Sequence, residues 1–561
     1  MASTSPIAST PTVLSSSPKA SSPSRPSTAV SVPLSQASTV APTPDYDTGE
    51  GDGDAESVIS EYHREAYGPE PGEKGWDQFE VRFEPNDPDD PHNWSRPRRW
   101  YITLFGGLLV LNATFASSAP SGIVPEMMEK FHFGREVATL TIALFVGGYC
   151  VGPLLWGPLS EQYGRKIPML AAFVCYCGFQ VGCALSPNTG AILIFRLLGG
   201  TFAAAPLVIS GALISDIWDP NTRGKALGFF TLAPFAGPCL GPTISGFMAV
   251  SGVTWRWVYW LLALFVGTCS ILILFTLPET YTPVLLVKRA EKLRKETGDN
   301  RWWAPFERRP KLSFSKRVEA IVARPFKVFF QEPMLIAITV YMSFIYGCIY
   351  LLFEAYPIVF TLGHNFNAGI SGLMFLPIFI GGCFGVFSYL LYWNPRYVKL
   401  ARDFAPNPVP PEYRLEPSIW AAPIFAGAFF WFGWTSYPSV SFWAPLVSGG
   451  PLGFAIIWIF LSLFNYIIDA YLFVAASALA SNTVIRSLFG ASFPLFATQM
   501  YNGMTPHWAS TLLGLIAVVM APIPILLTKY GAALRHKSKF APSRPSPVPM
   551  EVLPKKGDEA V

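Results

Sequence analysis

Apolar residues in this chain gather into twelve blocks of about 20 residues, and short polar stretches separate the blocks. A helix of about 20 apolar residues crosses a hydrocarbon core of about 30 Å, and it satisfies its own backbone hydrogen bonds. A helix on the surface of a soluble protein would instead carry its apolar residues in a stripe along one face. The blocks therefore predict an all-α membrane protein.

The blocks divide the chain into five segments. We expect a disordered cytosolic tail over 1–95, a six-helix bundle over 96–277, a cytosolic connector over 278–332, a second six-helix bundle over 333–530 and a cytosolic tail over 531–561. The first tail is rich in Ser, Thr, Pro and Ala, a composition that cannot form a packed core. The expected spans are 99–121, 137–159, 167–185, 191–214, 226–250, 257–277, 333–360, 369–392, 418–436, 442–464, 470–493 and 508–529.

The composition argues against a soluble enzyme. Charged residues make up 14% of the chain, compared with roughly 25% in soluble domains. No phosphate-binding loop of the Walker type occurs, so ATP hydrolysis is not expected. All eight cysteines fall within expected spans, which predicts neither a disulfide framework nor a metal site. We expect no cofactor, and a net charge of +4 gives no reason to expect a nucleic-acid partner.

Positive charges in the loops predict the orientation. They concentrate on one side of the membrane, which the positive-inside rule makes the cytosolic side. With an even number of spans, both termini are then cytosolic. The expected location is the plasma membrane, with the vacuolar membrane as the alternative. The charges on this side are Arg165, Lys166, Arg223, Lys225 and those within 288–327, 396–402 and 535–539, while Lys130 and Arg135 on the opposite side are exceptions.

The connector opens with an apolar run, Val284 to Val287, and five cations follow the run within eight residues. This pattern suits a helix that lies on the inner leaflet of the membrane. A solvated linker is the alternative.

The loop between the second and third expected spans reads Gly157-Pro158-Leu159-Ser160-Glu161-Gln162-Tyr163-Gly164-Arg165-Lys166. It resembles the signature loop of the major facilitator superfamily, in which glycine permits close helix approach and an acid precedes Gly-Arg-Lys. Glu161 stands where the family usually has Asp. The resemblance implies conformational gating by Gly157, Glu161, Gly164, Arg165 and Lys166, with Asp216 at the end of span four as the acidic partner. A basic turn that only sets topology is the alternative.

Spans four and five carry two further resemblances to the same superfamily. Arg196 in span four matches an intramembrane arginine that is implicated in proton transfer in its proton antiporters; the alternative is a side chain that reaches out to the membrane interface. In span five, Gly237-Pro238-Cys239-Leu240-Gly241-Pro242 resembles the antiporter motif. Glycines four residues apart let a neighbouring helix approach, and each proline favours a bend. This motif is characteristic of exporters.

Three other segments, 277–281, 353–360 and 465–471, are typical of the fungal twelve-span drug:proton antiporters. That group includes multidrug, polyamine and secondary-metabolite exporters, and the resemblance covers about residues 93–535. It implies the major facilitator fold, with twelve transmembrane helices in two six-helix bundles that rock around a cavity at the middle of the membrane.

Few ionisable residues lie inside the expected spans, and these are the candidates for proton coupling. Glu354 in span seven is the leading site for a proton or a cationic substrate, because burial favours the neutral form of a carboxyl group. Pairing of Glu354 with Arg196 or Arg486 is the alternative. Arg486 in span eleven is also a candidate structural partner of a helix carbonyl.

A substrate cavity lined by aromatic side chains is expected beside these residues. Tyr350 and its neighbours in span seven, together with Tyr466 and Tyr471, are suited to hold an apolar or cationic molecule by stacking and cation–π contact. Asn112 in span one is a polar residue that would line the same cavity.

The sequence as a whole predicts a proton-coupled efflux pump that exports small organic molecules such as a drug, toxin or secondary metabolite. The expected partners are the substrate, protons and membrane lipid, and the expected functional unit is a monomer. A polyamine or nutrient transporter of the same fold is one alternative. A transporter-like sensor that signals through the N-terminal tail is another.

Overall fold

The computed structural model describes residues 79–541, apart from 85, 219, 309–322 and 405–408. All of these residues belong to the second of the two units into which the chain divides, 61–561. The tail expected over 1–95 therefore lies outside the described residues up to 78. The same holds for 542–561 and for the middle of the connector.

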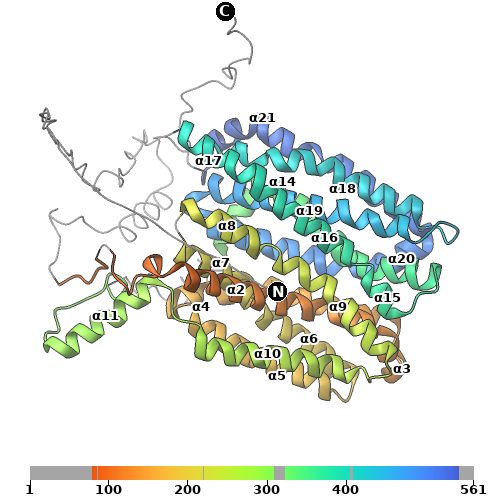
Figure 1. Ribbon diagram of the computed structural model, residues 1–561, viewed down its shortest axis with the longest axis horizontal. Coiled ribbons are helices and arrows are strands. Elements are labelled where there is room, and N and C mark those ends of the chain that lie inside the picture. The colour runs from red at the N-terminus through yellow and green to blue at the C-terminus, as the bar shows by residue number, and fades with distance from the viewer. Residues whose placement is uncertain (1–78, 85, 219, 309–322, 405–408, 542–561) are drawn as a thin grey trace, which may run out of the picture. The chain divides into compact units, whose positions relative to one another are not determined.

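Helices account for nearly all regular structure in the described part of the chain (Figure 1). In the first half they are α2 (Arg96–Ser118), α3 (Val124–Phe131), α4 (Arg135–Tyr163), α5 (Lys166–Leu185), α6 (Thr189–Ala203), α7 (Ala205–Ile217), α8 (Pro220–Phe230), α9 (Ala233–Val250) and α10 (Arg256–Thr276). The connector contributes α11 (Thr282–Thr297) and α13 (Arg324–Gln331). The second half consists of α14 (Pro333–Tyr356), α15 (Ala368–Leu373), α16 (Leu376–Ser388), α17 (Asn394–Asp403), α18 (Glu416–Thr435), α19 (Trp443–Ala470), α20 (Ala475–Met520) and α21 (Pro522–Lys537).

Ten stretches of the described chain are long and apolar enough to cross a membrane. The last of them, 475–537, holds two passes, because the chain turns at Thr505, where φ is 65°. α18 is a further pass: its 20 residues reach about 30 Å as a helix, although its tryptophans and prolines lower its mean hydropathy. Together these make the twelve passes that the sequence predicts.

The largest boundary difference concerns spans ten and eleven. The sequence places Asn465 and Asp469 at the start of span eleven, but α19 continues through both residues to Ala470. Asp469 accepts a hydrogen bond from Arg414 (2.8 Å), so its charge is compensated at the helix end and does not interrupt the helix.

The glycines of span five place α9 directly against α2. A Cβ atom on Gly237 would lie 2.1 Å from Oγ1 of Thr114, and one on Gly241 would lie 2.0 Å from Oγ of Ser118. No larger residue fits at either position without a backbone shift. The expected close approach at the span-five motif is therefore observed.

The two halves of the molecule meet along two pairs of helices, α4 with α20 and α9 with α15. On the second seam, a Cβ atom on Gly246 would lie 2.4 Å from the carbonyl oxygen of Ala368. We call the end of the helical bundle that holds Arg165 and the connector the connector side. The opposite end, which holds Arg135 and Glu354, is the far side.

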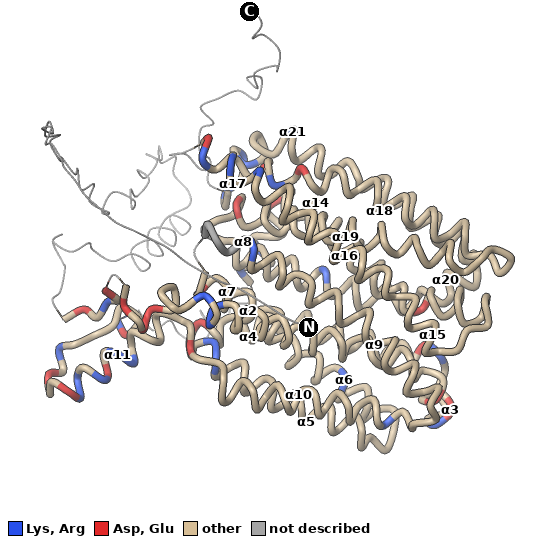
Figure 2. Tube along the Cα trace, in the orientation of Figure 1, with Lys and Arg blue, Asp and Glu red and all other residues tan. Residues whose placement is uncertain are grey.

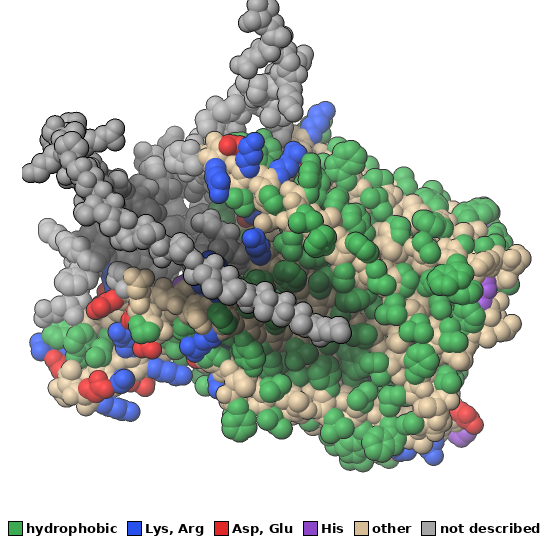
Figure 3. All heavy atoms as spheres, viewed as in Figure 1, with side chains coloured by type: hydrophobic (Ala, Val, Ile, Leu, Met, Phe, Trp, Pro, Cys, Tyr) green, Lys and Arg blue, Asp and Glu red, His purple; other side chains and the backbone are tan. Residues whose placement is uncertain are grey.

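Charges and apolar side chains separate along the bundle. Lys, Arg, Asp and Glu gather on α11 and at the ends of the helices, and few lie along their middles (Figure 2). Hydrophobic side chains cover the helices in the view of Figure 3, and large ones such as Phe275 and Val519 are each 78% exposed. This is the surface expected of helices that face lipid.

The start of the connector packs with the segment that precedes α2. Trp303 exchanges backbone hydrogen bonds with Phe79 (3.0 Å) and Val81 (2.9 Å). Val81, Ala290 and Ala304 form a small core of their own, and we call residues 79–87, apart from 85, together with 282–308 the connector unit. Residues 282–308 are therefore folded against 79–87, apart from 85, and whether α11 lies on the inner leaflet or in solvent stays a prediction.

Candidate functional site

The loop between α4 and α5 binds acids from two other helices. Nε of Arg165 donates to Oδ2 of Asp216 at the end of α7 (2.9 Å). Glu279, just after α10, accepts hydrogen bonds from the backbone N–H groups of Arg165 (2.8 Å) and Lys166 (3.2 Å). Burial lowers the pKa of Arg165, but its bond to Asp216 and the charge of that acid outweigh burial, so the pKa lies above its ordinary value. Arg165 is therefore always charged here.

Two glycines of this loop have different roles. Gly164 has a φ of 87°, and a Cβ atom on it would lie 2.3 Å from Oε2 of Glu279. A Cβ atom on Gly157 would lie 3.9 Å from the side chain of Val208, an ordinary van der Waals contact, so the close helix approach expected at this glycine is not seen in this structure. Close approach occurs one and two turns earlier in α4, where a Cβ atom on Gly152 would lie 2.1 Å from Cβ of Ala204 and one on Gly148 would lie 2.4 Å from the backbone nitrogen of Thr201.

Glu161 is exposed at the end of α4, and its charge contributes to the raised pKa of Arg165. Arg165 thus forms its ion pair with Asp216, while the exposed Glu161 contributes a further negative charge near the same guanidinium group. Whether this cluster gates a conformational change stays a prediction.

The second half carries a similar cluster, of which the sequence indicated only Asp469, as a residue with a gating or topological role near the cytosolic end. Arg414, between α17 and α18, donates to Asp469 at the end of α19 (2.8 Å). Glu412 in the same loop accepts two hydrogen bonds from Arg535 at the end of α21, each 3.0 Å. In both halves, a loop arginine thus pairs with an acid at the end of the helix two spans on. No Gly-Arg-Lys pattern marked this second loop.

Glu354 lies at the far side and joins the two halves. Its carboxylate accepts from Arg135 (3.4 Å) and Thr139 (3.1 Å) on α4, and from Thr498 (3.0 Å) on α20. The expected alternative partners, Arg196 and Arg486, are therefore wrong: the arginine that pairs with Glu354 is Arg135. The sequence did contain a signal for this pair, because Arg135 is one of the two cations on the side of the membrane opposite to the other loop cations.

Arg196 on α6 is fully buried. It donates to the backbone carbonyls of Thr141 (2.6 Å), Ala116 (2.9 Å) and Ser117 (3.3 Å), and its guanidinium lies 4.0 Å from the centre of the Phe145 ring. The alternative of a side chain at the membrane interface is wrong. Arg196 instead ties α6 to α2 and α4 within the first half.

Arg486 on α20 is surrounded by aromatic rings. Its guanidinium carbon lies 4.8 Å from the ring centre of Tyr346, 5.4 Å from that of Phe464 and 5.6 Å from that of Phe460. Its Nε is buried and donates no hydrogen bond to the described part of the chain. The proposed partner, a helix carbonyl, is not found among the described residues.

The remaining cavity candidates do not form one cluster. Tyr350 lies beside Tyr346 and shares a hydrogen bond with Ser117 of α2 (3.0 Å), so it lies where the halves meet. Asn112 is buried and donates to Cys269 (3.8 Å) within the first half. Tyr466 and Tyr471 are bonded to Met334 and Glu332 at the start of α14, on the connector side. The expectation of a shared aromatic cavity is therefore wrong for these two tyrosines.

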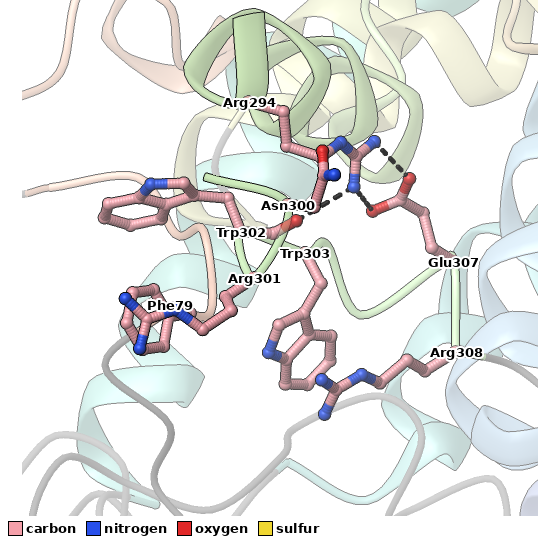
Figure 4. A pocket seen from close by; sticks show the side chains of 8 residues that line it. All are labelled: Phe79, Arg294, Asn300, Arg301, Trp302, Trp303, Glu307 and Arg308. Carbon is pink, nitrogen blue, oxygen red and sulfur yellow. Dashed lines mark hydrogen bonds and ion pairs between the residues drawn. The ribbon is translucent and has the colours of Figure 1, made fainter. Parts of the chain in front are cut away.

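A pocket of about 390 Å³ is lined by residues of the connector unit (Figure 4). Its three arginines are already engaged. Arg294 binds Glu307 (2.7 Å), Arg301 lies 4.1 Å above the ring of Phe79, and Arg308 lies 3.7 Å above that of Trp303. These contacts hold the connector unit together and do not mark it as the transport site.

The geometry is that of a transporter: two helical halves, an arginine within the spans of each half, and a carboxylate that bridges the halves at one end. Comparison with known families agrees. Residues 106–494 match the Major Facilitator Superfamily, and the chain belongs to this superfamily. The expected fold class is thereby confirmed, and the chain is a multi-pass membrane transporter and not an enzyme.

Named fungal relatives cover most of the chain. The major facilitator superfamily multidrug transporter mdrA of Aspergillus fumigatus is 41% identical over 83% of this chain and 76% of its own length. The citrinin biosynthesis cluster MFS transporter mrr1 of Monascus ruber is 41% identical over 82% of this chain and 91% of its own. The multidrug transporter FLU1 of Candida albicans is 40% identical over 83% and 76%. The resemblance to fungal drug transporters is thus confirmed.

Solved structures share the fold at low identity. The proton:xylose symporter XylE superposes with a TM-score of 0.56 at 17% identity, over 78% of this chain and 96% of that one. The human organic anion transporter MFSD10 gives a TM-score of 0.52 at 17% identity, over 76% and 99%.

Proposed function

We propose that this transporter is a proton-coupled exporter of small organic molecules in the plasma membrane. Its relatives are named as multidrug transporters and as the transporter of a biosynthetic cluster, which supports export of drugs or secondary metabolites. The span-five glycines, packed against α2, support the same direction of transport. A single chain supplies both halves, so we propose that a monomer is the functional unit.

The proposed orientation has the connector side in the cytosol. This places Arg165, Arg414 and Arg535 at the inner surface, as the positive-inside rule requires. The far side, with Glu354, then faces the exterior. Bundles over 96–277 and 333–530, linked by the connector over 278–332, stay the proposed division of the chain.

The observation that carries proton coupling is the set of partners of Glu354. When ionised, its carboxylate holds the outer ends of α4, α14 and α20 together through Arg135, Thr139 and Thr498. Protonation removes the charge that attracts Arg135, which makes separation of the halves at this end easier. An acidic exterior would thus shift the population toward the outward-open state, from which substrate is released. In this way the proton gradient would drive export.

The substitution Glu354→Gln tests this proposal. It mimics the protonated carboxyl group, so export should lose its dependence on external pH and fall by roughly tenfold or more under a proton gradient. The measurement is uptake of a fluorescent drug into inside-out vesicles at several pH gradients. Glu129→Gln is the matched control, because Glu129 is exposed on α3 at the same end of the bundle and forms no ion pair within the described part of the chain. Export by the Glu354→Gln variant at the parent's rate at every pH would rule out this site.

A further inference from the structure

Arg486 lies close to the middle of the membrane and close to the seam between the halves. It is the twelfth residue of α20, so about 17 Å of helix separates it from the helix start. Two residues away on the same helix, the carbonyl of Val484 accepts a hydrogen bond from Sγ of Cys150 on α4 (3.5 Å). The ring of Tyr346 packs on Gly490, and Val146 of α4 reaches the same glycine. Both halves therefore meet beside this arginine.

The charges inside the spans do not balance at Arg486. Arg196 is satisfied by three backbone carbonyls, and Glu354 is paired with Arg135. Among the described residues, no acid lies within ion-pair distance of Arg486. A cation inside a membrane is costly unless a counter-charge or hydrogen-bond acceptors reach it. This arginine thus lacks the anion that its position calls for.

We infer that Arg486 binds the negatively charged group of the substrate, and that the exported molecules are organic monoanions with an aromatic or apolar body, such as aromatic carboxylic acids. This inference rests on the proposed export function. A guanidinium group binds a carboxylate with charge-assisted hydrogen bonds, often two at once. The rings of Tyr346, Phe460 and Phe464 supply apolar surface for the body of the molecule.

The same geometry disfavours cationic substrates. The rings that would hold a cation by cation–π contact already carry the guanidinium of Arg486. A polyamine or cationic dye would place its charge next to that of the arginine, and like charges in a medium of low dielectric constant repel strongly. The expectation of a cationic ligand is therefore revised at Tyr346, the neighbour of Tyr350 whose ring carries this guanidinium.

Three molecules of one shape and different charge test the inference. They are 1-naphthaleneacetic acid, which is an anion at pH 7, its neutral amide, and the cationic 1-naphthylethylamine. Binding is measured by intrinsic tryptophan fluorescence on the purified full-length chain in detergent. The parent should bind the acid at least about tenfold more tightly than the amide, since a charge-assisted bond contributes that much, and the amine most weakly.

The variants identify the residue responsible. Arg486→Gln should abolish the preference for the acid and leave binding of the amide unchanged, while Arg486→Lys should retain part of the preference. Arg396→Gln is the control, because Arg396 on α17 pairs with Glu416 at the start of α18, on the connector side (2.9 Å). Unchanged amide binding also shows that the variants are folded.

Two results would overturn the inference: equal affinity of the parent for the acid and the amide, or a preference for the acid that survives in Arg486→Gln. Transport measurements in vesicles distinguish failure of the anion-site inference from failure of the proposed export function. Proton-driven movement of a neutral drug by a chain that shows no preference for anions would leave export standing and remove Arg486 as an anion site. A chain that binds the acid through Arg486 but transports no molecule under a proton gradient would support Arg486 as an anion site and contradict the proposed export function.

Discussion

At the scale of single residues, several charged side chains of this protein form specific ion pairs. Arg165 and Arg414 each bind an acid at a helix end on the connector side, Asp216 and Asp469, and both pairs stay within one half. Glu354 differs, because it binds Arg135 across the seam. An ion pair within one half stabilises the fold of that half, whereas an ion pair across the seam forms or breaks as one half moves against the other.

Loss of the Arg165 pair should affect all substrates alike. Arg165→Gln leaves the half-buried Asp216 without its cation, and removal of one partner of a fully buried pair costs about 3–5 kcal/mol, which is an upper limit here. We expect transport of every substrate to fall by at least roughly tenfold with unchanged substrate preference. Initial export rates of two chemically different drugs measure this, with Arg396→Gln as a surface control. A loss confined to one drug would show that Arg165 recognises substrate.

At the scale of elements, small residues decide which helices touch. Gly237 and Gly241 bring α9 onto α2, and Gly152 brings α4 onto the start of α7. The sequence identified the first two glycines by their spacing and misassigned the close approach within α4 to Gly157. Spacing alone shows that a glycine could pack closely, but the facing helix is known only once the chain is folded.

Alanine at Gly237 should destabilise the protein. Its Cβ atom would lie 2.1 Å from Thr114 and 2.5 Å from the backbone nitrogen of Phe115, and overpacking of this kind costs about 1–3 kcal/mol. Thermal unfolding of the purified protein in detergent should show a lower midpoint. Gly211→Ala is the matched control, because no atom lies within 4 Å of its added Cβ and alanine favours helix. Equal midpoints for both variants would contradict the packing argument.

At the scale of the whole molecule, contacts on the far side join the halves in this structure. Glu136 of α4 accepts from Gln499 of α20 (3.2 Å), next to the partners of Glu354. Rocking of the halves must separate these residues when the far side opens. The contact is therefore suited to a reversible lock.

A cross-link across this contact should stop transport. In Glu136→Cys/Gln499→Cys, a bis-methanethiosulfonate reagent, whose spacer bridges side-chain positions that a direct disulfide could not reach, would hold the far side closed, and export should fall to the background level and return after reduction. The measurement is export by vesicles before and after treatment with the cross-linker and then with a reductant. The two single-cysteine variants are the controls. Full activity of the cross-linked double variant would show that the halves do not separate here.

The connector unit should respond to acid. Burial raises the pKa of Asp87, but the hydrogen bond and charge of Arg289 outweigh it, so the pKa lies below its ordinary value. A carboxyl group with a lowered pKa in the folded state stabilises that state above the unfolded pKa of about 4. This stabilisation is lost as the pH falls through the folded pKa.

At neutral pH, Asp87→Asn should therefore speed amide hydrogen exchange at Val81 and Trp303, whose backbone bonds join the two segments. In the parent, the same loosening should appear only under acid. Exchange is measured by mass spectrometry, and Glu296→Gln is the control, since Glu296 is exposed and lies 3.8 Å from Lys292. Equal exchange in the parent and in Asp87→Asn at neutral pH would exclude this role for the ion pair.

The sequence by itself determined that the chain crosses a membrane twelve times, which superfamily it belongs to, and that Arg165 and Asp216 are suited to pair. Each of these follows from local composition or from a short motif, because a span needs only about 20 apolar residues in a row. Only the tertiary structure decided that Glu354 meets Arg135, 219 positions away, that Arg196 is satisfied by carbonyls, and that Arg486 lies among aromatic rings with no acid beside it in the part of the chain that the structure describes. Those facts depend on how helices pack across two halves, and the free energy of a buried charge is set by the neighbours that packing brings to it.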